Sequence, residues 1–514
     1  MSTNSVNTQA ENSTSRPELH VTAELGTLEA PAGAIVADRD LHVFHQFRPR
    51  QGEGSRWAHQ IASDVPYDWD VCDDVLAPQG DEIDVLAGSS IKVSADPNFA
   101  SAETENAVEL FFVTSTPLDP NSDKAQLQGN NIDHGSKGSR RFQIQRAYIP
   151  DVTELHDVSD DPSSADHRVE RLGPIDIDDS AHSVQDLVAP NVLWHEGSWL
   201  MIALSLTGET DAEVVVLRST DRQNWKVLGA LEVSPEAELP EGRPFAPRLV
   251  SLQDEATGRD HDVLFVTYPN ADNSRESTGY AVGKLDGAKF AVTTPYTVLD
   301  FGHDFTRPRV ISGDQPVMFG LVGAHPDFHE QWANCLSSPR FLTLLNGHIF
   351  QDVVGASRAV KGYSDRALIW TGQLDCSQGS VNVDILNKAG DRVTRITHDG
   401  FTATLTRNEG DSVSAQLSES SSSTLTVFVD GPICEVFVDG GALSLTSAIP
   451  TDFKVDSLQA EVSGGAGIIN SMLTVGQEIM RSSAGLDSPE DQERFIAEAI
   501  EADRAAARGE VSED

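Results

Sequence analysis

The chain has 514 residues and a formal net charge of −43, from 80 acidic and 37 basic residues. This length exceeds what one hydrophobic core usually serves, so we expect at least two domains. A surface this acidic repels nucleic acid and anionic lipid, which excludes both as partners, and the sequence has no apolar run of the ~20 residues that cross a membrane.

The first residues, MSTNSVNTQAENSTSRPE, are polar and lack the basic and apolar regions of a signal peptide. We expect residues 1–19 to form a disordered tail. The four cysteines, Cys72, Cys335, Cys376 and Cys434, lie far apart and fit no metal spacing. The scattered histidines likewise suggest no metal cluster. These features predict reduced thiols, a cytoplasmic protein, and neither a metal nor a cofactor.

Short strand signals dominate from residue 20 to about 475. Examples are HVFHQF at 42–47, VELFFVTS at 108–115, VVVLRS at 214–219 and LTVFVD at 425–430. No amphipathic helical pattern separates them, which predicts an all-β protein. A loose internal repeat, in which Asp64 precedes Trp69 and Asp221 precedes Trp225, is typical of propeller blades.

A helix is predicted near the C-terminus, within an acidic tail over 481–514. Ser488 is a suitable N-cap, Pro489 occupies the first helical position, and Gly509 ends the helix. Its short apolar stripe around Phe495 and Ile496 predicts docking on the body of the protein or on a second subunit, which would make a homo-oligomer. A solvated tail helix is the alternative.

Several segments, in the same order, resemble glycoside hydrolase family 32, the β-fructosidases. Residues 42–49 resemble the family's H-L-F-Y-Q-Y-N-P strand, 57–69 its W-G-H-A-x-S-x-D-L-x-x-W segment, 332–340 its W-A-G-x-L-x-x-P-R signature, and 425–450 its V-D-x-S-x-x-E-V-F-x-x-x-G pattern. This resemblance covers residues 28 to 475. It implies a five-bladed β-propeller over 20–345, with the active site in the central funnel, and a β-sandwich over 346–480.

The same resemblance locates the carboxylates of a retaining glycosidase, which needs a nucleophile and an acid. The family places its nucleophile, transition-state stabiliser and acid in N-D-P-N-G, R-D-P and E-C-P motifs. The matching segments here are 29–33 (EAPAG), 188–190 (VAP) and 245–247 (FAP). The three catalytic positions are therefore Ala30, Ala189 and Phe245, and no catalytic residue is predicted. The wall of the funnel also differs, with Arg48 for asparagine and Leu86-Ala87 for Phe-Ser.

We interpret the chain as a family member of the β-fructofuranosidase type that has lost catalysis and binds a sugar or serves in assembly. The alternative is an active β-fructosidase, acting on sucrose, sucrose phosphate or fructan, whose carboxylates have moved to Glu29 and Glu241. A rebuilt site of shifted specificity is a third possibility.

Three retained family residues, Gln46, Trp57 and His59, are the predicted contacts to a small carbohydrate. Trp57 and His59 have a second interpretation, in which they only close the core of the first blade. Asp430 and Glu435, in the sandwich motif, are interpreted as structural.

Overall fold

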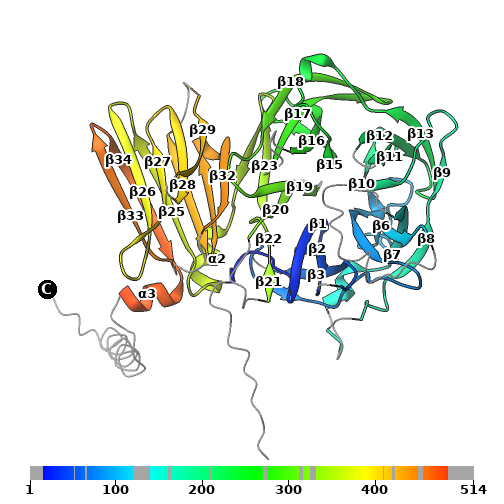
Figure 1. Cartoon of the computed structure of the whole chain (residues 1–514), viewed down its shortest axis with the longest axis horizontal. Helices are drawn as coiled ribbons and strands as arrows, with labels where there is room; N and C mark the ends of the chain where they lie inside the picture. Colours follow the sequence, from blue (N-terminus) through cyan, green and yellow to red (C-terminus); the bar gives the residue numbers. More distant parts are fainter. Residues whose placement is uncertain are drawn as a thin grey trace, which may run out of the picture.

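The computed structural model describes residues 16–483, apart from 51, 64–65, 120–138, 157, 160–163, 209–210, 270–274, 312–315, 325–330, 409, 419–422 and 450–454. Within these residues almost all regular structure is β-strand. A ring of sheets is followed along the chain by two stacked sheets, which lie beside the ring (Figure 1).

The ring contains five antiparallel sheets, or blades, among the described residues. Blade 1 consists of β1 (Gly26–Ala37), β2 (Asp40–Arg48), β3 (Arg56–Ala62) and β4 (Trp69–Val71), and blade 2 of β5 (Asp84–Lys92), β6 (Val108–Pro117), β7 (Arg140–Ile149) and β8 (Glu170–Pro174). Blade 3 consists of β10 (Leu187–His195), β11 (Ser198–Leu206), β12 (Ala212–Ser219) and β13 (Asn224–Ala230), with the short β9 (Asp176–Asp178) at its outer edge.

The last two blades are linked by one backbone pair, Asp254 with Leu344. Blade 4 consists of β15 (Phe245–Asp254), β16 (Arg259–Pro269), β17 (Glu276–Asp286) and β18 (Lys289–Val298), with β14 (Glu232–Val233) at its edge. Blade 5 consists of β19 (Phe305–Ile311), β20 (Val317–Val322), β22 (Cys335–Leu336), β23 (Arg340–Leu345) and β24 (His348–Asp352).

The first strand of each blade faces the central axis. These inner strands, β1, β5, β10, β15 and β19, contact one another in sequence, and β19 contacts β1, so the ring is closed. A short strand, β21 (Trp332–Ala333), completes the closure by pairing in parallel with Gly26 and Thr27 of β1. The expected five-bladed propeller is therefore present.

Every inner strand has an irregularity near its start. The register shifts at Leu28/Ala30, Leu86/Ser89, Val188/Asn191, Phe245/Arg248 and Thr306/Arg309. In three blades the residue before a proline has a positive φ, which is 53° at Ala189, 41° at Ala246 and 53° at Arg307. Proline has no N–H for the ladder, and a bulge bends the strand and re-aims its side chains. The five strand starts can therefore turn towards the axis.

Blade 2 has glycine where the other inner strands have proline. A Cβ on Gly88 would lie 1.8 Å from the carbonyl oxygen of Phe111, so a larger residue cannot follow Ala87. The predicted Asp-to-Trp turn is present in blade 3, where Asp221 accepts backbone hydrogen bonds from Gln223 and Asn224 before the buried Trp225. Its proposed counterpart, Asp64, lies outside the described residues.

The sandwich contains two five-stranded sheets. One consists of β32 (Leu443–Ala448), β31 (Ile433–Val438), β30 (Thr424–Asp430), β25 (Leu368–Asp375) and β34 (Gly467–Val475), and the other of β29 (Asp411–Gln416), β28 (Thr402–Asn408), β27 (Arg392–His398), β26 (Gly379–Asn387) and β33 (Val455–Gly464).

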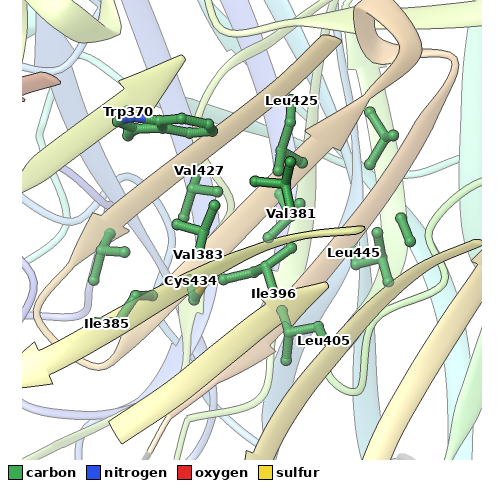
Figure 2. Packing of buried hydrophobic residues seen from close by; sticks show 14 of the residues in the cluster. Trp370, Val381, Val383, Ile385, Ile396, Leu405, Leu425, Val427, Cys434 and Leu445 are labelled. Carbon is green, nitrogen blue, oxygen red and sulfur yellow. The ribbon is translucent and has the colours of Figure 1, made fainter. Parts of the chain in front are cut away.

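Alternating apolar side chains of the two sheets interdigitate to form the sandwich core (Figure 2). Val381, Val383 and Ile385 of β26 face Leu425 and Val427 of β30, and all five are fully buried. Such period-two patterns place one face of each strand in the core. The predicted all-β class with propeller and sandwich is confirmed.

A buried ionic network joins propeller and sandwich. The guanidinium of Arg340 donates to Asp300 at 3.0 Å and to Glu435 at 2.9 Å. Asp430 accepts backbone hydrogen bonds from Glu18, Leu19 and His20 at 2.7 to 3.1 Å. The two acidic residues of the sandwich motif are therefore structural, as interpreted from the sequence.

Several element boundaries differ from those expected. Glu18 and Leu19, assigned to a tail, are held against the sandwich by their bonds to Asp430. β24 forms a hairpin with β23, which a boundary at 345 would divide. The helix α2 (Ala356–Tyr363) was not expected; it buries Ala356, Ala359 and Val360 at helical spacing.

At the end of the described chain, the helix α3 (Gln477–Ser483) begins four residues before the expected acidic tail. The helix predicted from Ser488 to Gly509 lies outside the described residues. No helix in the described part of the chain is long and apolar enough to cross a membrane.

Candidate active site

A pocket opens on the propeller axis, where the starts of the five inner strands meet. Its wall comes from all five blades and consists of Glu29, Ala30, Pro31, Gln46, Arg48, Leu86, Ala87, Val188, Ala189, Leu204, Leu206, Arg243, Phe245, Ala246, Arg248 and Arg307. The pocket has a volume of about 140 Å³. That is close to the ~150 Å³ cavity that accommodates benzene, so the enclosed part suits one small ring or an anion.

The three positions matched to the family's carboxylates all line this pocket. Ala30 comes from β1, Ala189 from β10 and Phe245 from β15. The three residues matched to the family motifs therefore lie in one pocket, although Ala30 and Phe245 are more than 200 residues apart in the sequence. Their side chains are two methyl groups and a phenyl ring, none of which transfers a proton or attacks carbon.

Glu29 is the one carboxylate among the described lining residues. It accepts hydrogen bonds from Nε of Arg48 at 2.9 Å, Nε2 of Gln46 at 2.5 Å and Oγ of Ser55 at 2.5 Å. Burial alone would lower the pKa of Arg48, but the charges of Glu29 and Asp84 outweigh burial and raise it. The Glu29 carboxylate thus belongs to an ion pair in the wall. The other candidate, Glu241, is exposed and does not line the pocket.

Of the three predicted ligand contacts, only Gln46 lines the pocket. Its Oε1 accepts a hydrogen bond from the backbone N–H of Ala87 at 2.6 Å, so Gln46 ties blade 1 to blade 2. Trp57 is fully buried behind the wall, and its indole N–H donates to the carbonyl of Leu86 at 3.1 Å.

His59 is also fully buried and is not a lining residue. Its ring stacks on Phe44 with 4.9 Å between centroids, and its Nε2 lies 3.1 Å from Nδ1 of His42. Burial lowers the pKa of His59 well below 6.5. The packing of Trp57 and His59 corresponds to the second interpretation, in which they close the core of the first blade.

Apart from Arg48, the arginines of the pocket were not singled out from the sequence. Arg243 lies over the ring of Phe245 at 5.6 Å, and Arg307 donates to Glu276 at 2.9 and 2.6 Å. Arg248 lines the pocket, with Arg309 on the neighbouring inner strand. A signal was present: a proline followed by Asn, Arg or Arg recurs at 190–191, 247–248 and 308–309, at the bulge of successive inner strands.

Comparison with known proteins identifies this architecture. The family model "Glycosyl hydrolases family 32 N-terminal domain" matches residues 20–352. The chain belongs to glycosyl hydrolase family 32. It is 25% identical to the sucrose-6-phosphate hydrolase of Bacillus subtilis over 369 residues, covering 67% of this chain and 66% of that protein. It is 24% identical to an invertase of Wickerhamomyces anomalus over 335 residues, covering 62% and 53%. The chain thus matches less than two thirds of the length of these curated relatives.

Solved structures of family-32 proteins share the whole fold. The sucrose-6-phosphate hydrolase of Lactobacillus gasseri has a TM-score of 0.66 at 17% identity, covering 92% of this chain and 95% of the other. A β-fructofuranosidase of Bombyx mori has a TM-score of 0.64 at 18% identity, covering 88% and 94%. At such identities the likeness establishes the fold alone.

Family-32 chemistry cleaves a glycosidic bond with a pair of carboxyl groups. In retaining enzymes the two lie about 5–5.5 Å apart, one attacking the anomeric carbon and one protonating the leaving oxygen. The pocket described here has Glu29 and, among the described lining residues, no second carboxylate. Across the described chain, no group of three or more His, Cys, Asp or Glu side chains has the arrangement of a metal site.

Proposed function

We propose that the chain is a family-32 protein of the β-fructofuranosidase type that binds a small carbohydrate in its funnel without hydrolysing it. The observation that carries this proposal is the composition of the pocket wall. Ala30, Ala189 and Phe245 occupy the positions at which the family pattern has its three carboxylates.

The pocket lacks a residue for nucleophilic attack and a residue for protonation of the leaving group. A methyl group at position 30 cannot form a glycosyl-enzyme bond, and a phenyl ring at position 245 cannot donate a proton to the leaving group. General acid catalysis alone contributes about 10²- to 10⁴-fold. Without nucleophile and acid, the remaining wall can position a sugar but has no route to cleave it.

The relocated-carboxylate alternative requires both Glu29 and Glu241. Glu29 accepts three hydrogen bonds, one of them from Arg48. Glu29 stands beside the nucleophile position, where a carboxylate oxygen must be free to attack carbon, whereas both of its oxygens accept hydrogen bonds from the wall. Glu241 is exposed outside the pocket. The positions of these two residues therefore favour the non-hydrolytic proposal.

A carbohydrate is the favoured ligand class because similar proteins are named as hydrolases of sucrose 6-phosphate. The pocket offers apolar surface from Leu86, Leu204 and Phe245 beside the polar Gln46, and sugar sites generally combine such surfaces. A role in assembly is the second option and would use an outer face of the protein.

Three further expectations stay predictions. A cytoplasmic location is supported by four buried cysteines that form no disulfide. We place the domain boundary after Asp352, because β24 completes blade 5. Self-association through the predicted helix after Ser488 concerns residues outside the described part of the chain.

The decisive assay is fructose release from sucrose, sucrose 6-phosphate and levan by the purified full-length chain. The sucrose-6-phosphate hydrolase of Bacillus subtilis serves as the active control. We expect no release above the buffer blank. Turnover by the wild type that Glu29→Gln or Glu241→Gln abolishes would overturn the proposal, because the catalytic carboxylates would then have moved to these residues.

A further inference from the structure

Two buried arginines lie at the inner end of the funnel without a carboxylate partner. Arg248 on β15 and Arg309 on β19 are 5% and 4% exposed. Nη1 of Arg248 donates to the carbonyls of Ala189 and Pro247 at 2.9 and 2.6 Å, and Nε of Arg309 donates to that of Pro31 at 3.3 Å. Nε of Arg248 and both Nη atoms of Arg309 are buried with no hydrogen-bond partner within the described chain.

These cations differ from the other buried arginines of the described chain, Arg140, Arg146 and Arg340, each of which has a carboxylate partner. Arg340 is neutralised by Asp300 and Glu435, as buried charges normally are. Burial lowers the pKa of Arg248 to about 9, which leaves it charged at neutral pH. Burial also lowers the pKa of Arg309, and the nearby charge of Arg248 lowers it further. The two guanidinium groups share a buried region, and the acceptors to which they donate are neutral carbonyls.

The missing negative charge coincides with the altered family positions. Arg248 is bonded to the carbonyl of Ala189, and Arg309 to that of Pro31, which follows Ala30. The family resemblance implies a carboxylate at both alanines. With alanine at both positions, the arginine pair lacks the two nearby negative charges that the resemblance implies.

The pocket wall is positively charged, whereas the protein as a whole is strongly negative. Four arginines and one glutamate line the pocket, whereas the whole chain carries −43. Among them, Arg48 is paired with Glu29 and Arg307 with Glu276. The axial site thus combines positive charge with low hydration, which strengthens its attraction for a small anion.

We propose that the inner end of the funnel binds the phosphate or carboxylate group of a small molecule, through direct contact with Arg248 and with Arg309 behind it. Guanidinium groups suit these planar or multi-oxygen anions because they offer several donors in a fixed fork. Leu86 and Phe245 would flank the uncharged remainder. This inference deepens the proposed function and rests on the funnel being a binding pocket.

Calorimetric titration at pH 7 and constant ionic strength tests this site, with inorganic phosphate, fructose 6-phosphate and fructose as probes. We expect both anions to bind one per chain and fructose to bind at least about tenfold more weakly. Tighter binding of fructose 6-phosphate than of phosphate would support a sugar anion as the occupant, and equal binding would support a free anion. No binding of either anion overturns the proposal.

Substitution identifies the residues. Arg248→Met and Arg309→Met should each weaken phosphate binding by roughly 10- to 100-fold, while Arg259→Met, at an exposed site on β16, should leave it unchanged. Unchanged affinity in both pocket variants would show that the anion binds elsewhere and would overturn the assignment.

A gain-of-charge variant keeps the test valid if the arginine variants do not fold. Ala30→Asp supplies the absent counter-charge, so it should raise the melting temperature and abolish phosphate binding. Ala30→Asn, of equal size but uncharged, should do neither. An Asp variant that is no more stable than the Asn variant and still binds phosphate would refute the inference. Release of fructose would contradict only the proposed lack of hydrolysis. Absence of anion binding would contradict only the proposed anion site at Arg248 and Arg309.

Discussion

Replacing His20 by glutamine should remove a pH dependence of stability between pH 6.5 and 9. The imidazole is fully buried, with Nδ1 at 2.7 Å from Asp430 and Nε2 at 3.9 Å from Glu435. Burial alone would lower its pKa, but the two carboxylates outweigh burial and raise the pKa from 6.5 to about 9. The imidazolium therefore stabilises the folded state.

The sign and size follow from linkage. A raised pKa in the folded state contributes stability that is fully present below pH 6.5 and is lost as the pH rises through about 9. At about 1.4 kcal/mol for each pH unit, the interval amounts to about 3 kcal/mol. The stability of the wild type should exceed that of His20→Gln most at pH 6.5. At pH 9.5 this difference in stability should be smaller by about 3 kcal/mol.

Hydrogen exchange is the suitable measurement, because a protein with two cores need not unfold in one step. The amides of Leu19 and His20 donate to Asp430, so their opening free energies report this contact directly. His45→Gln is the control: His45 is fully buried, and burial lowers its pKa to about 3, so it stays neutral throughout the range. Equal pH slopes in the wild type and His20→Gln would refute the assignment of charge to His20.

Two further substitutions test the buried ionic groups. Arg340→Met should lower the local free energy of opening by about 3–5 kcal/mol, because it leaves Asp300 and Glu435 buried without the guanidinium. Hydrogen exchange at the amide of Thr446, which donates to Asp300, measures this, and a loss below about 1 kcal/mol would contradict it. For Asp262, burial alone would raise the pKa, but hydrogen bonds from groups that include His195 lower it to about 2. The wild type should therefore be more stable than Asp262→Asn above pH 4, and this difference in unfolding free energy should decline by about 2 kcal/mol as the pH falls to 2. Thermal unfolding measures the difference, and a difference that stays constant over that range would argue against this pKa.

The positions of the family carboxylates could be predicted because each precedes a proline that fixes the start of an inner strand. Ala30, Ala189 and Phe245 are found in one pocket for that reason. The strand signal at 425–430 likewise corresponds to β30, whose alternating residues Leu425 and Val427 are buried in the sandwich core.

Other features depended on contacts between distant residues. Trp57 and His59 belong to family motifs, but a motif does not say whether a side chain faces the axis or the space between blades. The arginine pair is visible only once β15 and β19 are neighbours, because no local pattern reveals that Arg309 lacks a carboxylate. The contact of residues 18–20 with Asp430 was equally inaccessible from a polar N-terminal sequence.

The bond between Glu18 and Asp430 spans 412 residues, and this separation sets an order of events during protein synthesis. At about 5–20 residues per second, the ribosome adds the intervening chain in roughly 20 to 80 s. Throughout that time the N-terminal amides have no native acceptor. β1 likewise awaits β21, its partner at the seam of the ring. The nascent propeller therefore cannot close its ring until the last blade has left the ribosome. Glu18, which is made early, is among the last residues to form its native contact.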